Sequence, residues 1–287
     1  MVTIVADTLS SIPAEEAREL GIPYIPQIII FGSEEFKDDY EMNFESFLQR
    51  FKTSAELPKT AAPPPALYTP IFKKFTEAGE TVMVVAPSAE MSGTVRGATA
   101  GAEDFPNTDI RIIDSGTLGS ALGSMVYKAH EWAKAGMDAD KLEANLKDLI
   151  NRQRTYFVVD TLEYLHRGGR IGGAQMLLGG LLQVKPILQI KNGRIEPLEN
   201  QRTKSRALAR LKELVLAEYP RQEDGMLTIM HGDALVEAEC LRDELAEAGL
   251  PRARIYNLPP AILVHVGPGV VAASFFVSND RASKSAA

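Results

Sequence analysis

The sequence predicts an α/β fold arranged as two domains, and three observations lead to that prediction. Strand-like apolar runs alternate with amphipathic helical stretches throughout, as is typical of α/β proteins. The 287 residues give room for two domains of ordinary size. The pattern changes after Arg152, where a glycine-arginine corner and a hairpin follow. We therefore expect an N-terminal domain at 1–155, a C-terminal domain at 156–280 with exchange of segments allowed, and a small, polar, flexible tail at 281–287.

The N-terminal half begins with a buried strand at 2–6, which ends in the acidic turn Asp7–Ser11. Phenylalanines at 44, 47 and 51 recur at helical spacing and predict a helix over 43–51. Prolines at 63–65 are suited to opening the next helix, which runs towards Phe75. The other predicted elements of this half are strands at 25–31, 81–86 and 110–113 and helices at 94–103, 118–134 and 140–152.

In the second half, Asn192-Gly193 is a strong hairpin signal between strands at 186–190 and 194–198. The alternation around His265 predicts a strand at 262–266, with His265 on the face opposite its apolar neighbours. The remaining predicted elements are strands at 156–160, 226–230, 254–256 and 271–277 and helices at 203–219 and 234–248.

Composition and charge exclude several classes of protein. The chain is 45% hydrophobic and 24% charged, the balance of a folded protein. Its net charge of -7 argues against general nucleic-acid binding, which normally needs a basic face. The single cysteine, Cys240, excludes an internal disulfide and a cysteine-rich zinc site. The start has no secretory-signal pattern and no apolar run reaches the roughly 18 residues of a membrane span, so we expect a cytoplasmic protein.

A turn of small polar residues, Pro87–Thr94, directly follows the predicted strand at 81–86. A strand, a small-residue turn and a helix form the arrangement in which open backbone N–H groups face an anion. Ser92 is suited to cap the following helix, and Thr94 adds a second hydroxyl. The plain alternative is a well-capped helix. The turn lacks the Lys-Ser/Thr ending of a P-loop, which argues against an ATP site.

Two more turns of this kind are found in the N-terminal half. Thr60-Ala61-Ala62-Pro63 precedes a predicted helix, and Asp114–Thr117 follows the strand at 110–113. Three such turns resemble the mouth of a doubly wound sheet, where ligands gather at the carboxyl ends of the strands. Thr60 would then lie beside the Ser92 turn, although a simple loop threonine is the alternative.

The most informative segment is the basic corner at 162–171. Gly168 and Gly169 allow a sharp turn and a close approach to a ligand. Arg167 and Arg170 place guanidinium groups, which can grip a phosphate or carboxylate, beside that turn. An apolar stretch at 176–178 and a strand-like segment at 184–188 follow. The combination predicts a ligand with an anionic head and an apolar body.

No catalytic constellation is evident. The sequence has no G-x-S-x-G nucleophile elbow, and Cys240 is interpreted as an inert, packed residue in the middle of a helix. The histidines at 130, 166 and 231 have no metal-ligand spacing, so we predict no metal site. His265 can be interpreted in two ways. A lone strand histidine is commonly structural, but the Gly267-Pro268-Gly269 loop that follows it could bring the imidazole to a domain cleft.

Together these motifs resemble those of the DegV family of fatty-acid-binding proteins, which present acyl chains to a bacterial fatty-acid kinase. The resemblance extends over nearly the whole chain, and its most specific part is the Leu165-x-x-Gly-Gly-Arg-Ile171 block followed by Lys185-Pro186-Ile187. The other matching segments are Asp7–Ser11, Thr60–Pro63, Met91–Thr94, Asp114-Ser115, Leu162–Leu165 and His265–Gly269.

The resemblance implies a two-domain DegV-like fold, with a doubly wound parallel-type sheet in the N-terminal domain and a mixed sheet in the C-terminal α/β domain. It implies a long-chain fatty acid such as palmitate in a buried tunnel, no cofactor, and a role in phospholipid metabolism. The carboxylate would be held by Thr60 and Ser92–Thr94 (including Gly93), with His265 nearby. Arg170 and Arg202 would meet the kinase or the phosphorylated head group.

This chain departs from the family pattern at two places. Relatives usually carry Thr-Ser-Gln-Pro where it has Thr60-Ala61-Ala62-Pro63, and favour serine and leucine where it has Ala89-Glu90-Met91. Fewer polar groups therefore surround the head. Two alternatives to a carrier remain open: an enzyme acting on a small phosphorylated substrate, with Ser92 holding phosphate and Arg170 assisting transfer, and a regulatory module that senses a lipid.

A fatty acid is also reasonable on energetic grounds. Burial of roughly fourteen methylenes at about 0.8 kcal/mol each supplies on the order of 11 kcal/mol before association costs. Neutral hydroxyls then need only prevent an unpaired buried charge, and they leave one carboxylate oxygen available for phosphorylation. Loading of such a ligand requires contact with a bilayer, for which the segment 174–182 is either a mobile interfacial helix or an ordinary core helix.

Overall fold

The computed structural model describes residues 1–178 and 184–279. The predicted tail at 281–287 and the last residues of the predicted interfacial segment at 174–182 lie outside this part of the chain. Two compact units are present: residues 1–150 with 259–261, and residues 151–258 with the chain from 262 onward. The sequence-based boundary near residue 155 falls inside strand β8 (Gln153–Val158), because helix α6 (Ala139–Arg152) runs directly into that strand.

Unit 1 is built around a four-stranded parallel sheet of order β2-β1-β6-β7. Its strands are β1 (Val2–Asp7), β2 (Tyr24–Ile25), β6 (Thr81–Ala86) and β7 (Ile110–Asp114). The strands are rich in valine and isoleucine and are buried on both faces, as parallel strands covered by helices on both sides must be. The predicted doubly wound parallel sheet of the N-terminal domain is therefore confirmed.

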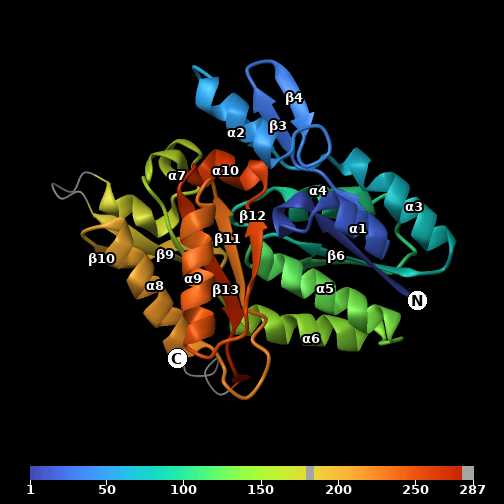
Figure 1. Cartoon of the computed structure of the whole chain (residues 1–287). Helices are drawn as coiled ribbons and strands as arrows, with labels where there is room; N and C mark the ends of the chain where they lie inside the picture. Colours follow the sequence, from blue (N-terminus) through green and yellow to red (C-terminus); the bar gives the residue numbers. More distant parts are fainter. Residues whose placement is uncertain (179–183, 280–287) are drawn as a thin grey trace. The chain divides into compact units, whose positions relative to one another are not determined.

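The two faces of this sheet are covered by different helices, visible in Figure 1. Val82, Val84 and Ala86 alternate onto the face covered by α3 and α4, where Tyr68 and Phe72 complete the core. The opposite face packs mainly against α5, whose first two turns are fully buried. The helical elements of this unit are η1 (Thr8–Ser10), α1 (Ala14–Leu20), α2 (Phe44–Thr53), η2 (Pro65–Leu67), α3 (Thr69–Glu77), α4 (Thr94–Ala102), α5 (Ser120–Lys134) and α6 (Ala139–Arg152).

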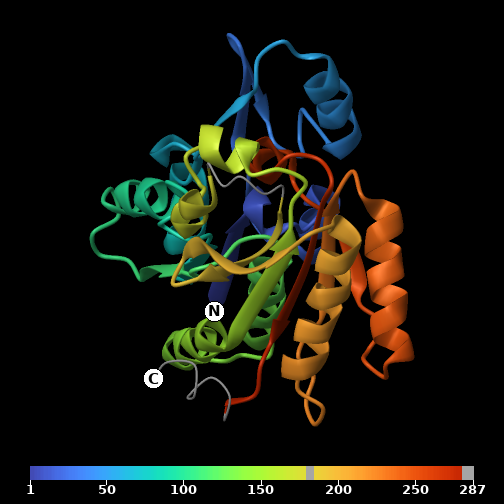
Figure 2. The ribbon, with the colours of Figure 1, turned by 90° about the vertical axis from the view of Figure 1, so that its left-hand side faces the viewer.

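A second, three-stranded antiparallel sheet of order β4-β3-β5 also belongs to unit 1 (Figure 2). Its strands are β3 (Ile28–Phe31), β4 (Glu34–Lys37) and β5 (Lys59–Ala61), and α2 packs on it through the ring contacts of Phe31 with Phe47. The prediction of one continuous strand at 25–31 was wrong. Pro26 and Gln27 separate two strands of different sheets, because proline has no N–H for a ladder and Gln27 turns its side chain inward.

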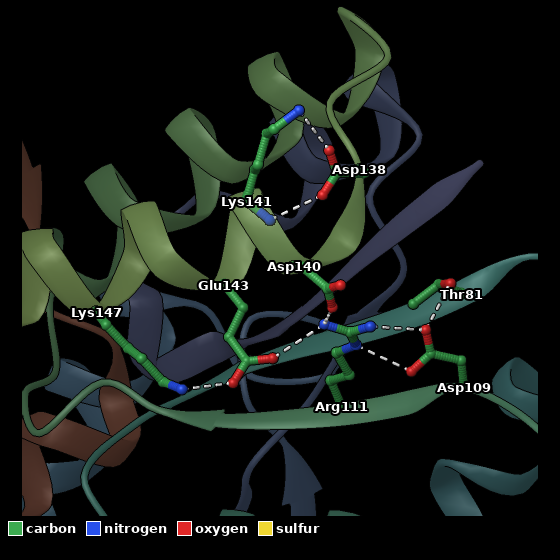
Figure 3. A network of polar contacts seen from close by, with 8 residues as sticks. All are labelled: Thr81, Asp109, Arg111, Asp138, Asp140, Lys141, Glu143 and Lys147. Atoms are coloured by element: carbon green, nitrogen blue, oxygen red, sulfur yellow. Dashed lines mark hydrogen bonds and ion pairs between the residues drawn. The ribbon is translucent and has the colours of Figure 1, made fainter.

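The amino-terminal edge of the parallel sheet carries an ion-pair network centred on Arg111 (Figure 3). Its guanidinium donates to Asp109 at 2.9 and 3.0 Å, to Asp140 at 2.7 Å and to Glu143 at 3.1 Å. The network ties β7 to α6, and Thr81 at the start of β6 donates to Asp109 at 3.0 Å. The hydrogen bonds from Arg111 and Thr81 lower the pKa of Asp109, and those from Lys147 and, to a lesser extent, Arg111 lower the pKa of Glu143, so both carboxyl groups stay ionised.

Unit 2 contains a six-stranded mixed sheet of order β10-β9-β8-β13-β11-β12, in which only β11 and β12 pair in parallel. The sheet agrees with the mixed sheet expected for the C-terminal domain. Asn192 and Gly193 both have positive φ, 51° and 76°, and form the predicted hairpin turn between β9 and β10. The strands are β8 (Gln153–Val158), β9 (Lys185–Lys191), β10 (Arg194–Gln201), β11 (Thr228–Gly232), β12 (Arg254–Asn257) and β13 (Val270–Phe276).

Helices α8 (Lys204–Glu218) and α9 (Leu235–Glu247) lie side by side on one face of this sheet, as Figures 1 and 2 both show. Ala207, Leu211 and Val215 recur at helical spacing and bury the inner face of α8. Every second residue of β13, beginning with Val271, points into the same core. The other helical elements are α7 (Glu163–Arg167), η3 (Gly172–Leu177) and α10 (Pro260–Val266).

The segment that carries His265 is a helix, α10, and the prediction of a strand at 262–266 was wrong. Isoleucine and valine favour strands in isolation, but Pro260 occupies the first helical position, where its fixed φ favours a helix. The helix is buried nearly all round, so its apolar residues have no amphipathic period to reveal it. A smaller difference concerns the helix expected from Pro63 to Phe75, which is a short η2 turn followed by α3.

Candidate ligand-binding site

Polar turns gather at the carboxyl-terminal edge of the parallel sheet in unit 1. Strands β1, β6 and β7 are parallel neighbours, so the residues that follow them share one edge. Asp7 ends β1, the turn 87–93 follows β6, and Asp114–Thr117 follows β7. The last two are joined by a hydrogen bond from the Ser88 N–H to the Thr117 carbonyl at 2.8 Å. The sheet mouth predicted from the sequence is thus formed, with Asp7 as a member that the prediction did not include.

Thr60 belongs to the antiparallel sheet, unlike the turns at 87–93 and 114–117. It lies in β5, opposite Ile29 of the antiparallel sheet, and does not follow a strand of the parallel sheet. The chain after it is held against α4 by glycines spaced four residues apart, at positions 93, 97 and 101. A Cβ at Gly93 would lie 3.1 Å from the Ala62 Cβ, and one at Gly97 would lie 2.5 Å from the Pro63 carbonyl oxygen.

This glycine stripe determines which segments meet at the site. Because Gly93, Gly97 and Gly101 lie on one face of α4, the segment from Ala62 to Tyr68 can pack directly against the helix backbone. Ala62, two residues after Thr60, is thereby brought beside Gly93 in the turn that contains Ser92. The spacing was available in the sequence as a signal, since small residues four apart on a helix indicate close backbone packing.

Ser92 is half-buried in the turn before α4. The sequence predicted it as the N-cap residue of this helix, but it lies one residue before the N-cap. The N-cap residue is Gly93, which has no side chain to cap the helix. The Ser92 Oγ accepts the Thr94 N–H at 3.2 Å and lies 3.0 Å from the Thr94 Oγ1. The Ser92 hydroxyl is therefore held by its neighbour in the first turn of the helix.

Thr94 is almost completely buried and is held from behind by two residues far away in the sequence. Its Oγ1 donates to the Asp7 Oδ2 at 2.9 Å and accepts from the Gln27 Nε2 at 2.9 Å. Gln27 also donates to the same Asp7 oxygen, at 2.6 Å. Thr94, which the sequence grouped with the ligand-contacting hydroxyls, thus occupies a supporting position behind Ser92.

Asp7 has the environment of a buried acid without a cationic partner in its hydrogen bonds. Its other oxygen, Oδ1, accepts the Leu9 N–H at 3.0 Å and caps η1. Burial raises the pKa of Asp7 to about 7, although the hydrogen bonds from Thr94, Gln27 and Leu9 each lower it. Near neutral pH, the group is therefore present in both protonation states.

A second buried acid, Asp38, lies after β4. Its Oδ2 accepts the Ala261 N–H in the first turn of α10 at 3.3 Å, within unit 1. Burial raises the pKa of Asp38 to about 8, and the negative charge of Asp7 contributes to the rise. The Asp38-Asp39 pair gives no sequence signal for the bond between Asp38 and α10, because Ala261 is more than two hundred residues away.

Unit 2 brings together His265 and Arg170 from the basic corner. The Arg170 Nη1 donates to the Gly168 carbonyl at 2.7 Å, and a Cβ on Gly168 would overlap the Nδ1 of His265. Burial, and to a lesser extent the charge of Arg170, lowers the pKa of His265 to about 4. The imidazole is therefore neutral at physiological pH. Gly168 is a glycine because the end of α10 packs against this turn.

Two further basic residues of unit 2, Arg202 and Arg167, lie on the surface. Arg202 is exposed in the connection between β10 and α8, and Arg167 is exposed and paired with Glu163 at 3.1 Å. Cys240 is also exposed, contrary to the packed position expected, because it lies on the outer side of α9. Its hydrogen bond with Glu244 raises the pKa of the thiol, so a reactive thiolate is not favoured.

Each unit by itself contains uncharged polar groups: unit 1 has the Ser92 and Thr60 hydroxyls, and unit 2 has the neutral imidazole of His265. Within residues 1–178 and 184–279, no three His, Cys, Asp or Glu side chains lie close enough to hold a metal ion. In the same described residues, no helix combines the length and the apolar character needed to cross a bilayer.

Comparison with known proteins gives a consistent result. Residues 1–278 match the DegV family, which is described as a family of uncharacterised proteins. A DegV domain-containing protein of Streptomyces coelicolor is 34% identical over 273 residues, which cover 94% of this chain and 96% of that protein. Two solved structures are 29% identical and cover 96% of this chain and 99% of theirs: a fatty-acid-binding DegV family protein from Thermus thermophilus, with a TM-score of 0.89, and the fatty acid binding protein DegV from Bacillus subtilis, with a TM-score of 0.87.

Proposed function

Because this chain belongs to the DegV family, we propose that it binds a long-chain fatty acid such as palmitate and presents the carboxylate to a separate fatty-acid kinase. The observation that carries the proposal is the combination of uncharged donors at Ser92 and Thr60 with close structural similarity to two fatty-acid-binding proteins. On this proposal the protein is a carrier without catalytic residues of its own.

The chemistry of the head-group residues fits such a carrier. An ionised carboxylate must keep its hydrogen bonds when it leaves water, because an unpaired buried charge costs many kcal/mol. Two hydroxyls and a neutral imidazole can supply these bonds without neutralising the carboxylate. Its oxygens then remain nucleophilic enough to attack the γ-phosphorus of ATP in the kinase. A bidentate arginine pair would hold both oxygens and oppose that step.

Two cations of unit 2, the half-buried Arg170 and the exposed Arg202, are suited to a partner or a phosphorylated product. We assign Arg170 and Arg202 to contact with the kinase or with the acyl phosphate formed on it. Met176 is 78% exposed and Leu178 is partly exposed near the basic corner, which supports transient contact with a membrane surface. Co-sedimentation with anionic and neutral vesicles tests this contact, and equal recovery in the supernatant with both would exclude it.

The first test of the proposal is the ligand itself. Mass spectrometry of an organic extract of the purified protein is expected to find fatty acid in near-stoichiometric amount. An extract without lipid, from protein that also fails to take up added palmitate, would contradict fatty-acid binding. Addition of a fatty-acid kinase and ATP then separates a carrier from a lipid sensor, because only a carrier supports acyl-phosphate formation.

The Thr60→Ala and Ser92→Ala variants test the assignment of the head-group donors. Loss of one hydrogen bond to a carboxylate costs about 1.5–3 kcal/mol, so each variant is expected to bind palmitate roughly 10- to 100-fold more weakly. Thr99→Ala, at an exposed position of α4, is the matched control and is expected to bind normally. Unchanged affinity in both site variants would show that these hydroxyls do not hold the carboxylate.

A further inference from the structure

Asp7 is linked to Ser92 through the Thr94 hydroxyl, so its protonation state can determine where the Ser92 hydrogen points. Asp7, Gln27 and Thr94 are exposed by only 2%, 3% and 1%, respectively, and their side chains are mutually hydrogen-bonded. Ser92 is the outermost member of the chain and is half-buried. The Thr94 hydroxyl has one hydrogen and two lone pairs to share among three polar neighbours.

When Asp7 is ionised it can only accept hydrogen bonds, so the Thr94 hydrogen points to it. One Thr94 lone pair accepts from the Gln27 Nε2. The remaining lone pair can be satisfied only by the hydrogen of Ser92, 3.0 Å away. In this state the Ser92 hydroxyl points inward and turns a lone pair towards an incoming carboxylate.

When Asp7 is protonated the direction of the chain reverses. Asp7 then donates to Thr94, whose second lone pair still accepts from Gln27. Thr94 must now donate to Ser92. The Ser92 Oγ accepts both this hydrogen and the Thr94 N–H. Both lone pairs of Ser92 are filled, and its own hydrogen is directed outward to the ligand.

We propose that Asp7 is a positioning residue that takes up a proton when the anionic head group binds, and thereby makes Ser92 a hydrogen-bond donor to the carboxylate. The proposal rests on the proposed function, since the ligand is taken to be a fatty-acid anion at Ser92. Its consequence is a carrier whose affinity depends on pH although the fatty acid stays ionised. The proton also removes a buried negative charge from behind the site.

The groups around Asp7 are compatible with this role. Burial raises the pKa of Asp7 to about 7, so a proton is available near neutral pH. The titratable groups that interact with it are Tyr24 of β2, Tyr68 at the start of α3 and Asp38 after β4, and the negative charge of Asp7 raises the pKa of each. None of the three is a cation, so none of them stabilises the ionised form of Asp7 by charge.

The helices packed against β1 add little positive charge there. From α4, the guanidinium of the exposed Arg96 lies near Gly93. Helix α5 contacts β1; its residues from Ser120 to Val126 are buried and uncharged, and its charged residues begin at Lys128.

Isothermal titration calorimetry with laurate tests the proposal. Laurate is soluble, and its carboxyl group resembles that of glutamate, with a pKa of about 4.3, so it is ionised throughout the range used. Titrations in two buffers of different ionisation enthalpy give the number of protons taken up. We expect close to one proton per laurate near pH 8 and little uptake near pH 6, with affinity falling towards tenfold per pH unit above about pH 7.

Two variants and a matched control assign the proton. Asp7→Asn is expected to abolish both the uptake and the pH dependence of affinity, while Asp109→Asn removes a charge from the other end of the same sheet and is expected to retain both. If Asp7→Asn does not fold, Thr94→Val keeps the carboxyl group but breaks the hydroxyl chain, and it is expected to lower the uptake.

The outcomes separate this proposal from the proposed function. Tight binding of laurate by the wild-type protein near pH 8 without proton uptake would overturn the role of Asp7 and leave fatty-acid binding intact. Uptake that persists in Asp7→Asn, or that is unchanged in Thr94→Val, would also overturn it. Failure to bind laurate or palmitate at either pH would overturn the proposed function itself.

Discussion

The two edges of the parallel sheet in unit 1 place the same residue type in opposite environments. At the amino-terminal edge, Asp109 is half-exposed and accepts two hydrogen bonds from Arg111, which lower the pKa of its carboxyl group (Figure 3). At the carboxyl-terminal edge, Asp7 is buried and bonded to a threonine, an amide and a backbone N–H, and its pKa is raised to about 7.

The difference shows how one sheet separates stability from function. A carboxylate paired with a guanidinium keeps its charge over the whole physiological range and ties β7 to α6. A carboxylate surrounded by neutral donors can gain a proton near neutral pH, at a cost to stability when it is ionised. Such a residue is retained where a change of charge is useful, which in this fold is the ligand-binding edge.

The largest effect expected from this comparison is the pH dependence of stability. The unfolded Asp7 loses its proton near about pH 3.9, whereas the folded one keeps it up to about pH 7. Between these values the folded state binds more protons, so the free energy of unfolding falls as pH rises, by up to about 1.4 kcal/mol per unit. Urea unfolding of the wild type and of Asp7→Asn is expected to show a difference that declines from about pH 5 to about pH 7 and then levels off.

Asp109→Asn is the control for that measurement, because folding lowers the pKa of Asp109 whereas it raises the pKa of Asp7. The pKa of Asp109 is lowered in the folded state. Its contribution to the free energy of unfolding is therefore complete above the unfolded pKa of about 3.9 and is lost only as pH falls below that value. The difference between wild type and Asp109→Asn should therefore be flat between about pH 5 and 7. Parallel curves for the wild type and Asp7→Asn would contradict the assignment of a buried, protonatable acid.

A smaller effect is expected from the glycine stripe that builds the ligand-binding edge. Gly97→Ala would normally stabilise a helix by about 1 kcal/mol. Here the added Cβ would lie 2.5 Å from the Pro63 carbonyl oxygen, a backbone atom that cannot move alone. We expect a net loss of about 1–3 kcal/mol together with weaker palmitate binding, measured by urea unfolding and titration. A more stable protein would show that the close approach of these segments is not required; Thr99→Ala serves as the control for helix propensity.

The smallest effect is expected at the amino-terminal edge of the parallel sheet. Arg111→Met keeps the apolar stem of the side chain but removes the centre of the ion-pair network. Networks at a protein surface contribute about 1 kcal/mol, and salt screens them. The variant should lose that amount in low salt and less in about 1 M salt, with fatty-acid binding unchanged. Reduced binding in this variant would indicate that the two edges are coupled.

Several features of the candidate site could be predicted because their signals are local. Asn192-Gly193 required a particular turn, and the phenylalanine spacing of α2 indicated which face is buried. Other features depended on distant partners. The run at 25–31 has the pattern of one strand, and only the pairing of β2 with β1 and of β3 with β5 divides it into two. His265 was assigned to a strand because it alternates with apolar residues in the run 262–266, whereas burial on nearly all sides permits a helix there.

By itself, the sequence determined the alternation of strands and helices, the family motifs and the small polar residues at the strand ends, because each depends on neighbours within a few positions. Only the tertiary structure decided that Asp7 supports Ser92 through Thr94, since these residues lie 87 positions apart and meet only when β1 and α4 pack together. The tertiary structure also decided the protonation of Asp7, because burial sets the pKa of its carboxyl group and burial cannot be read from the sequence alone.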